Sequence, residues 1–403
     1  RLCLNLHYML KRLFSFFLFL NREVGFKYCK ITEIYWILPS LMGNSKLDYI
    51  CNMFKAIFSI PNRRLKAKWE RHDLAFKKPA KTSRETFKKK DTYILKLGFE
   101  DEEIKGLGEC SPLWTLSIDP KDGYSEKLDW VCANINDCEG FIYSDELSKY
   151  PSIQFGLETA LLDLQNGGRK VIFPSHFTEG KDSIEINGLI WMGNYEYMTQ
   201  QIEEKIGLGF TCVKLKIGAI DWEEEKKLLH NIRNRFSPDQ MELRVDANGA
   251  FSAEKVMDKL QFLADLDIHS IEQPILARQT SLMADLCIKT PIPIALDEEL
   301  IGIKTYAEKE QLIQQIQPQY IILKPSLIGG IKSCNEWIEI AQKHKVGWWA
   351  TSALEGNIGL NAIAQFAYKT GNKMPQGLGT GQLFESNFES NLFLDGNKMK
   401  YSN

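Results

Sequence analysis

A regular alternation of short apolar runs with amphipathic runs begins near residue 184 and continues almost to the C-terminus. Each apolar run is long enough for one buried strand, and the runs between them have the periodicity of helices that bury one face. The predicted strands are Ile184–Trp191, Cys212–Ile217, Glu242–Asp246, Ile268–Glu272, Ile292–Asp297, Tyr320–Lys324, Val346–Thr351 and a weaker Gly377–Gly381. Eight strand–helix units in about 200 residues favour a parallel α/β barrel over an open doubly wound sheet, which usually has fewer strands.

The residues before this alternation have the pattern of a small α+β domain. Alternating apolar residues in 65–69 and 93–99 predict strands of an antiparallel sheet, and the run IQFGLETALLDLQ at 153–165 predicts a buried helix. The polar stretch from Lys77 to Asp91 predicts a long loop between the two strands. The predicted divisions are 53–180 for this domain, 181–375 for the barrel, and 376–403 for the last strand and a segment that returns to the N-terminal domain.

Residues 1–52 differ in composition from the rest of the chain. They contain seven Lys and Arg against three Asp and Glu, and 10 of the 45 aromatic residues. The apolar run Leu13–Leu20 follows two basic residues as in a signal peptide, but it has only eight residues and no small-residue cleavage site follows it. A membrane-spanning helix needs about 20 apolar residues. We expect this segment to be an extension that adds nothing to the folded core.

The composition of the whole chain excludes several classes of protein. Fifty basic residues against 52 acidic ones give a formal charge of −2, so no basic excess points to nucleic acid or to an anionic membrane. Nine cysteines without a C-x-x-C pair indicate neither a disulfide scaffold nor a zinc framework. Thiols of this kind are typical of a reducing, cytoplasmic compartment.

Ionisable residues stand at the carboxyl ends of five successive predicted strands, which in a parallel barrel open onto one shared site. These ends read Lys214-Leu-Lys216, Asp246-Ala-Asn248-Gly249, Glu272-Gln273-Pro274, Asp297-Glu298-Glu299 and Lys324-Pro325. The carboxylates of Asp246, Glu272 and Asp297 are 26 and 25 residues apart, which is one strand–helix repeat each. Neighbouring strands therefore place them side by side, where they repel one another and require a cation. Oxygen ligands of this kind suit Mg²⁺.

Three lysines flank the predicted metal site. Lys214 and Lys216 are two residues apart, so both face the barrel interior, and Lys324 stands across the mouth from them. A buried lysine near other cations has a lowered proton affinity and can act as a base near neutral pH. A divalent cation stabilises the second negative charge that forms when a proton leaves the carbon next to a carboxylate. The set predicts an enzyme for this proton transfer on a small-molecule carboxylate.

These motifs, in this order and at these intervals, resemble the enolase superfamily and, within it, the subgroup of the muconate-lactonising enzymes. The resemblance covers about residues 65–395 and implies a modified TIM barrel, (β/α)7β-like, with an N-terminal α+β capping domain. It also implies that the three carboxylates bind Mg²⁺, or Mn²⁺ in its place. Lys216 would be the base on one face of the substrate, Lys324 would act on the opposite face, and Lys214 would lower the proton affinity of Lys216.

Five further stretches resemble one family of this subgroup, the o-succinylbenzoate synthases of menaquinone biosynthesis. They are FKKPAKTSR (76–84), GLGECSPLW (106–114), FGLETALLDL (155–164), TSALEGNIGLNAIAQ (351–365) and QGLGTGQLF (376–384). This resemblance implies dehydration of 2-succinyl-6-hydroxy-2,4-cyclohexadiene-1-carboxylate to 2-succinylbenzoate through a metal-stabilised enediolate. Two alternatives stay open: racemisation of N-succinyl or other N-acyl amino acids by the same two lysines, and a catalytically inactive scaffold barrel.

Other polar residues near the predicted mouth of the barrel are candidates for substrate binding. Arg84, in the polar loop, is expected to reach over the mouth, and Arg244 is a candidate for either a substrate contact or a structural ion pair. Asn248 is expected to support the metal ligands. Ser352 and the glycines of the 379–381 turn, Gly379 and Gly381, offer hydroxyl and backbone N–H groups to a carboxylate. No histidine falls at a predicted strand end, which argues against histidine catalysis.

Overall fold

The structure is a computed structural model in which residues 63–81, 86–218 and 220–402 are described. The predictions for residues 1–52 and for Arg84 lie outside these ranges. None of the helices formed by the described residues combines the length and the apolar character needed to cross a membrane.

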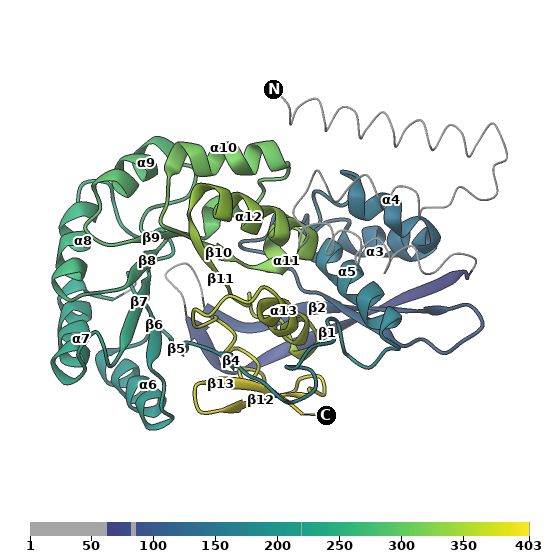
Figure 1. Ribbon diagram of the computed structural model, residues 1–403, viewed down its shortest axis with the longest axis horizontal. Helices are drawn as coiled ribbons and strands as arrows, with labels where there is room; N and C mark the ends of the chain where they lie inside the picture. The colour runs from purple at the N-terminus through teal and green to yellow at the C-terminus, as the bar shows by residue number, and fades with distance from the viewer. Residues whose placement is uncertain (1–62, 82–85, 219, 403) are drawn as a thin grey trace. The chain divides into compact units, whose positions relative to one another are not determined.

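The N-terminal part is a three-stranded antiparallel sheet with helices packed against it (Figure 1). The strands are β1 (Leu65–Lys81), β2 (Thr86–Phe99) and β3 (Gly106–Cys110), and the helices are α3 (Tyr124–Ala133), the 3₁₀ turn η2 (Ile135–Asp137), α4 (Cys138–Tyr143) and α5 (Pro151–Gln165). Both predicted strands and the predicted buried helix are confirmed. Nearly every residue of α5 is buried, which explains why apolar side chains cover most of its surface.

The predicted loop between Lys77 and Asp91 is wrong for the described residues, because β1 continues to Lys81, β2 begins at Thr86, and the two strands pair along this polar stretch. A distant segment of the chain stabilises the extended hairpin. The backbone N–H of Lys77 donates to the carbonyl oxygen of Leu383 at 2.9 Å, and the Phe76 ring lies 4.7 Å from that of Phe384. Contacts of this kind cannot be recognised from the polar sequence of the hairpin itself.

Helix α5 lies directly on β3, because glycines on both elements remove the side chains that would separate them. A Cβ atom on Gly108 would lie 1.8 Å from the carbonyl oxygen of Gly156, and one on Gly156 would lie 2.3 Å from the sulfur of Cys110. The stretches GLGECSPLW and FGLETALLDL therefore form one close helix–strand contact.

We expect Gly108→Ala to lower the free energy of unfolding by at least about 1–3 kcal/mol, because the added methyl group overlaps the backbone of α5. Gly140→Ala on α4 is the control, since a Cβ there has nothing within 4 Å. Alanine at this position should stabilise the protein by up to about 1 kcal/mol. Urea unfolding of both variants compares them, and equal stability would contradict the close contact.

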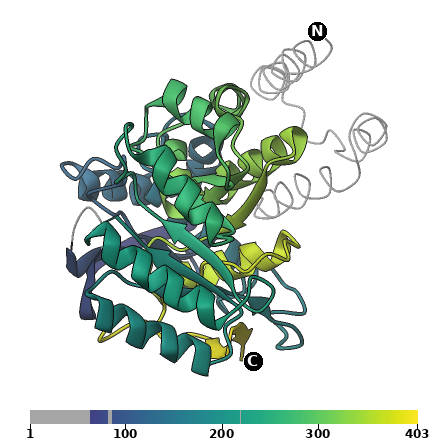
Figure 2. The same cartoon turned by 90° about the vertical axis from the view of Figure 1, so that its left-hand side faces the viewer.

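The second part is a sheet of seven parallel strands in which sequence neighbours are also spatial neighbours, with helices on its outer face (Figures 1 and 2). The strands are β5 (Gly188–Ile190), β6 (Cys212–Lys216), β7 (Glu242–Asp246), β8 (Ser270–Glu272), β9 (Ile294–Leu296), β10 (Tyr320–Leu323) and β11 (Gly347–Ala350). The helices are α6 (Tyr195–Gly207), α7 (Trp222–Arg235), α8 (Val256–Asp265), α9 (Thr280–Lys289), η3 (Glu298–Leu300), α10 (Tyr306–Ile316), α11 (Pro325–Ile328), α12 (Gly330–His344) and α13 (Asn357–Lys369).

The sheet closes into a barrel through single residues, so the predicted eighth strand Gly377–Gly381 is wrong. Gln376 forms a parallel bridge with Ile186, and Gly377 forms one with Thr351. The backbone hydrogen bonds of these two bridges measure 2.8 to 3.0 Å. Two residues thus join the segment just before β5 to the residue just after β11, and the glycine-rich segment that follows contributes to the cavity at the mouth of the barrel.

The C-terminal segment returns to the start of the barrel. Its hairpin, β12 (Leu392–Asp395) and β13 (Lys398–Tyr401), pairs with the short strand β4 (Ile184–Glu185). The described residues belong to one unit, 62–403, so the boundaries placed within it from the sequence stay predictions.

Candidate active site

Successive strands of the barrel deliver charged side chains to the same mouth. β6 ends at Lys216, β7 at Asp246 and β8 at Glu272, and the strand register places these three residues in one row. Asp297 directly follows β9, and Lys324 directly follows β10. The structure therefore brings together the residues that the strand ends predicted.

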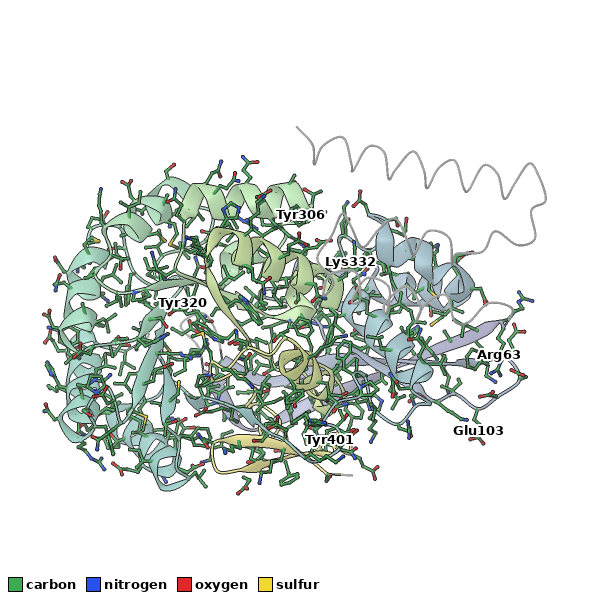
Figure 3. The ribbon with its side chains drawn as sticks, in the orientation of Figure 1. Arg63, Glu103, Tyr306, Tyr320, Lys332 and Tyr401 are labelled. Carbon is green, nitrogen blue, oxygen red and sulfur yellow. The ribbon has the colours of Figure 1, made fainter. Side chains whose placement is uncertain are left out.

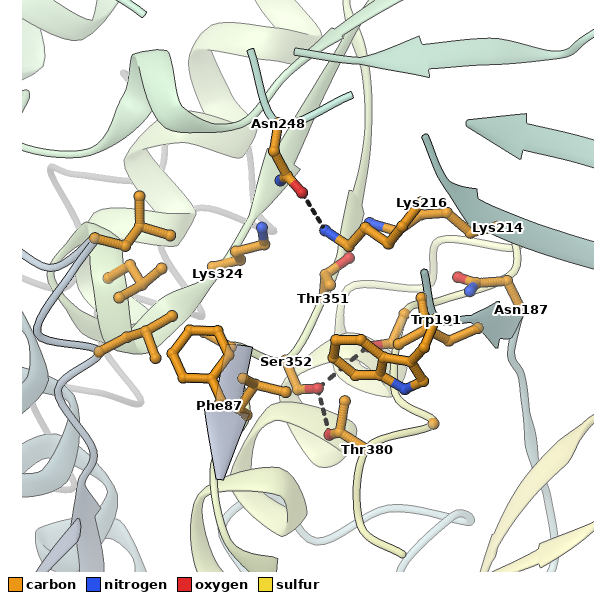
Figure 4. Close-up of a pocket in the computed structure, with 18 of the residues that line it drawn as sticks. Phe87, Asn187, Trp191, Lys214, Lys216, Asn248, Lys324, Thr351, Ser352 and Thr380 are labelled. Carbon is orange, nitrogen blue, oxygen red and sulfur yellow. Dashed lines mark hydrogen bonds between the residues drawn. The ribbon is translucent and has the colours of Figure 1, made fainter. Parts of the chain in front are cut away.

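A cavity of about 760 Å³, including the part open to solvent, lies at this mouth (Figure 4). Lys214 and Lys216 line one side of it, and Lys324 lines the other (Figure 4). Apolar side chains form much of the remaining wall: Phe87, Leu113, Leu116, Leu189, Trp191, Leu327, Ala353 and Leu354. Such a cavity suits a small ligand that is anionic at one end and apolar along its body.

Lys214 and Lys216 are held by the carboxylates of the next two strands. Lys216 Nζ donates to Asp246 Oδ2 at 2.6 Å and to Asn248 Oδ1 at 3.0 Å. Lys214 Nζ donates to Glu272 Oε2 at 2.6 Å and lies 2.9 Å from Asp246 Oδ2. Asn248 thus helps to orient the lysine predicted to be the base.

Lys324 is held on the other side of the cavity. Its Nζ donates to Asp297 Oδ2 and, at 3.5 Å, to Glu272 Oε1. Every carboxylate of the predicted metal site therefore contacts an ammonium group, and none of the six side chains is more than 10 % exposed. Three positive and three negative charges balance one another away from water.

The three buried carboxylates have different pKa values. Burial and the neighbouring charge of Asp246 raise the pKa of Glu272 to about 7. Burial and the charge of Glu298 also raise the pKa of Asp297. Burial alone would raise the pKa of Asp246, but the ammonium groups of Lys214 and Lys216 hold this pKa well below its usual range. Burial therefore favours the protonated form of Glu272 and Asp297, whereas Asp246 stays ionised beside its two lysines.

The lysines on the two sides of the cavity also differ in pKa. Burial lowers the pKa of Lys216, and the positive charge of Lys214 adds to this effect against the attraction of Asp246. Burial alone would lower the pKa of Lys324, but the carboxylates of Asp297 and Glu272 raise this pKa. Lys216 is therefore the lysine that loses its proton more readily, whereas Lys324 stays charged.

The buried carboxylates are the candidate metal ligands, with lysine ammonium groups between them. Within the described part of the chain, no three Asp, Glu, His or Cys side chains lie close enough together to coordinate one metal ion. The donor set still fits Mg²⁺, because it consists only of carboxylate oxygens from three adjacent strands.

Three of the predicted substrate-binding residues line the cavity: Asn248, Ser352 and Gly379. The Ser352 hydroxyl shares a hydrogen bond of 2.6 Å with that of Thr380 (Figure 4). Gly381 packs instead against Leu360, whose side chain a Cβ on this glycine would approach to 2.8 Å.

Arg244 does not reach the cavity. It lies on β7 two residues before Asp246, and therefore roughly 7 Å deeper in the barrel. Its Nε donates to Glu242 Oε1 at 2.6 Å, and its guanidinium lies 4.3 Å from the centre of the Trp349 ring. Trp349 packs in turn on Tyr320, which Figure 3 labels. Of the two predicted roles, the structure agrees with the ion pair.

Several cavity residues were missed by the sequence reasoning. Asn187 and Thr351 stand where the barrel closes, and within the described ranges Asn187 Oδ1 and Thr351 Oγ1 are buried without a hydrogen-bond partner. Thr351 directly follows β11, so its strand-end position was a usable signal. Phe87 comes from β2 of the N-terminal sheet, and no feature of its own sequence predicts that it faces the barrel.

Comparison with known proteins agrees with this fold. Residues 197–397 match the family described as enolase C-terminal domain-like. The chain is 44% identical to the o-succinylbenzoate synthase of Desulfotalea psychrophila over 358 residues, which cover 81% of this chain and 96% of that protein. The crystal structure of MenC from Desulfotalea psychrophila LSv54 matches with a TM-score of 0.74 and 42% identity, covering 83% of this chain and 99% of that one.

A more distant structure shows the shared fold alone. It is a dipeptide epimerase from Enterococcus faecalis V583 complexed with Mg and the dipeptide L-Leu-L-Tyr, with a TM-score of 0.72 at 19% identity. The match covers 84% of this chain and 97% of that one.

The barrel and its lysine–carboxylate mouth define a modified TIM-barrel enzyme with an N-terminal capping domain. The chain belongs to the enolase superfamily, and its identity to an o-succinylbenzoate synthase extends over most of its length. The resemblance inferred from five strand ends is thereby confirmed.

Proposed function

We propose that the chain is a carbon–oxygen lyase that dehydrates 2-succinyl-6-hydroxy-2,4-cyclohexadiene-1-carboxylate to 2-succinylbenzoate. The observation that carries this proposal is the placement of Lys216 and Lys324 on opposite sides of one cavity, next to three buried carboxylates. The choice of substrate is supported by the 44% identity to an o-succinylbenzoate synthase, of which the chain covers 96%.

The proposed reaction removes a proton and a hydroxyl group from neighbouring ring carbons and leaves an aromatic ring. Lys216, in its neutral form, takes the proton from the carbon that bears the carboxylate. The electrons of the broken C–H bond form the new ring double bond, the C–O bond to the hydroxyl breaks, and Lys216 returns its proton to the departing oxygen as water. Lys324 stays charged and stabilises the anion from the other face, while Lys214 lowers the pKa of Lys216.

Asp246, Glu272 and Asp297 would hold Mg²⁺ or Mn²⁺ in this proposal. When bound, the ion supplies positive charge where the substrate carboxylate gains negative charge. An Mg complex of the Enterococcus faecalis dipeptide epimerase, which has the same fold, supports the choice of ion.

The seam where the barrel closes is proposed to bind the succinyl group. A buried polar atom without a partner costs about 1–3 kcal/mol, which a ligand can recover by supplying the missing hydrogen bond. Asn187 and Thr351, which carry such atoms, line the cavity, and Ser352 and Gly379 line it as well. We propose that Thr351, Ser352 and the backbone of Gly379 contact the succinyl carboxylate.

We expect Thr351→Val to raise the KM for the substrate about tenfold and to change kcat by less than about threefold, because one hydrogen bond to the bound substrate is lost. Thr199→Val is a matched control. Its Oγ1 is equally buried and without a partner among the described residues, but Thr199 lies on α6 and does not line the cavity. An unchanged KM in both variants, measured by steady-state kinetics, would contradict the succinyl contact.

Growth of a menaquinone-requiring host that lacks o-succinylbenzoate synthase tests the proposed function. We expect the intact chain to restore growth and Lys216→Ala to fail. Deuterium exchange at the alpha carbon of N-succinyl amino acids in D₂O tests the racemase alternative. Exchange without restored growth would show that the two lysines serve racemisation instead.

A further inference from the structure

Lys90, on β2, is a buried lysine outside the proposed catalytic site. Its ammonium group extends from the N-terminal sheet to the barrel, and the residue is only 5 % exposed. Lys90 Nζ donates to Ser111 Oγ at 2.6 Å, to the carbonyl oxygen of Ala353 at 3.3 Å and to that of Leu354 at 3.1 Å. Ser111 directly follows β3, whereas Ala353 and Leu354 follow β11, so one side chain joins the two parts of the fold.

The segment that Lys90 holds is part of the cavity wall. Thr351, Ser352, Ala353 and Leu354 all line the cavity. Leu354 has a φ of 66°, in the left-handed region that residues other than glycine rarely adopt. Such a conformation persists only when its surroundings enforce it. The hydrogen bond from Lys90 to the Leu354 carbonyl oxygen helps to hold the backbone in this conformation.

Two buried carboxylates also bind the backbone of this segment and of the residues that follow it. Glu355 Oε2 accepts a hydrogen bond from the backbone N–H of Ala353 at 2.6 Å. Glu109, on β3, accepts from the backbone N–H groups of Gly356 at 2.6 Å and Gly359 at 2.8 Å. Two charged side chains of the N-terminal sheet, one cationic and one anionic, therefore hold the backbone on both sides of Glu355.

We infer that Lys90 is a positioning residue that holds Ala353 and Leu354 so that the cavity wall has its binding shape before the substrate arrives. Glu109 acts in the same direction from the other end of the segment. The inference rests on the proposed function in that it takes this cavity as the place of substrate binding. A purely structural tie between sheet and barrel would instead change stability and leave KM unaltered.

Lys309 offers a matched control for Lys90. It is also buried, at 1 % exposed, and its Nζ donates to Ser333 Oγ at 2.6 Å and to Glu336 Oε2 at 2.7 Å. It lies on α10 and does not line the cavity. We expect Lys90→Met to raise KM about tenfold and to change kcat by less than about threefold relative to the wild type. Lys309→Met should change each of these constants by less than about twofold. Both variants should lower the melting temperature, because each removes a buried ammonium group from its partners.

A second variant and a second readout keep the test decisive if Lys90→Met folds poorly. Glu109→Gln should raise KM in the same direction by about threefold, because it weakens the hold on Gly356 and Gly359. Hydrogen exchange of the backbone amides of residues 351–356 reports the hold directly, and we expect faster exchange in the Lys90 and Glu109 variants but not in Lys309→Met.

The outcomes separate this inference from the proposed function. A folded wild-type chain that does not turn over the cyclohexadiene substrate would overturn the proposed function, while hydrogen exchange would still report whether Lys90 holds the segment. An active wild type with unchanged KM in Lys90→Met and Glu109→Gln would overturn the positioning role, whatever the exchange rates show.

Discussion

Lys216→Ala is expected to lower kcat about 10²–10⁴-fold, while KM changes by less than about threefold. In the proposed mechanism this lysine both takes the alpha proton and returns it to the leaving oxygen. Lys324 cannot take over the role, because it stands on the other side of the cavity and its carboxylate partners raise its pKa. The fold should persist, since Lys214 remains 2.9 Å from Asp246 and still neutralises it.

The control for this variant is Lys309→Ala, which removes another buried lysine away from the cavity. Both variants are compared by the absorbance change of the reaction and by thermal unfolding. A folded Lys216→Ala protein that keeps more than about one tenth of the wild-type kcat would show that another group is the base.

Removal of divalent cations is expected to lower turnover at least about 10³-fold, because several kcal/mol of charge stabilisation are lost from the anion. Dialysis against a chelator followed by titration with Mg²⁺ should restore the rate. Mg²⁺ should also raise the melting temperature of the wild type, since an ion that binds only the folded state stabilises it. Full turnover in the presence of the chelator would contradict a metal-dependent mechanism.

The metal ligands are tested by comparing two buried carboxylates. Glu272→Gln should raise the Mg²⁺ concentration for half-maximal rate more than about tenfold and should abolish the stabilisation by Mg²⁺. Asp163→Asn is the control, because Asp163 is equally buried but accepts hydrogen bonds from backbone N–H groups in the N-terminal part. An equal response to Mg²⁺ in the two variants would rule out Glu272 as a ligand.

The sequence predicted the barrel and the charged site well because both follow from local rules. Each strand is a short apolar run, and in a parallel barrel every strand ends at the same mouth. Lys216, Asp246 and Glu272 therefore lie in one row, as their spacing implied. The resemblance to the enolase superfamily was carried by the same residues.

The features that the sequence could not predict depend on contacts between distant segments. The hairpin through Lys77–Asp91 is polar, and its stability comes from residues near 383. The barrel closes through Gln376 and Gly377 alone, which is too short a pairing to leave a strand pattern. Lys90 falls within the predicted polar loop, yet it is buried against carbonyl groups of residues 353 and 354.

Arg244 shows a second limit of prediction from the sequence, which concerns how deep in the barrel a side chain lies. Its position on the same face as Asp246 was predicted correctly, but two residues along a strand move a side chain a whole layer away from the mouth. A strand face therefore identifies which side chains point inward, and only the strand end identifies which of them reach a ligand.

The most direct test of the proposed function follows the reaction itself by proton NMR. Purified full-length chain, supplied with Mg²⁺, is incubated with 2-succinyl-6-hydroxy-2,4-cyclohexadiene-1-carboxylate, alongside Lys216→Ala. We expect the aromatic signals of 2-succinylbenzoate to replace the diene signals with the wild type and not with the variant. Persistence of the diene signals with folded, Mg²⁺-supplied wild type would contradict the assignment of the chain as a dehydrating lyase.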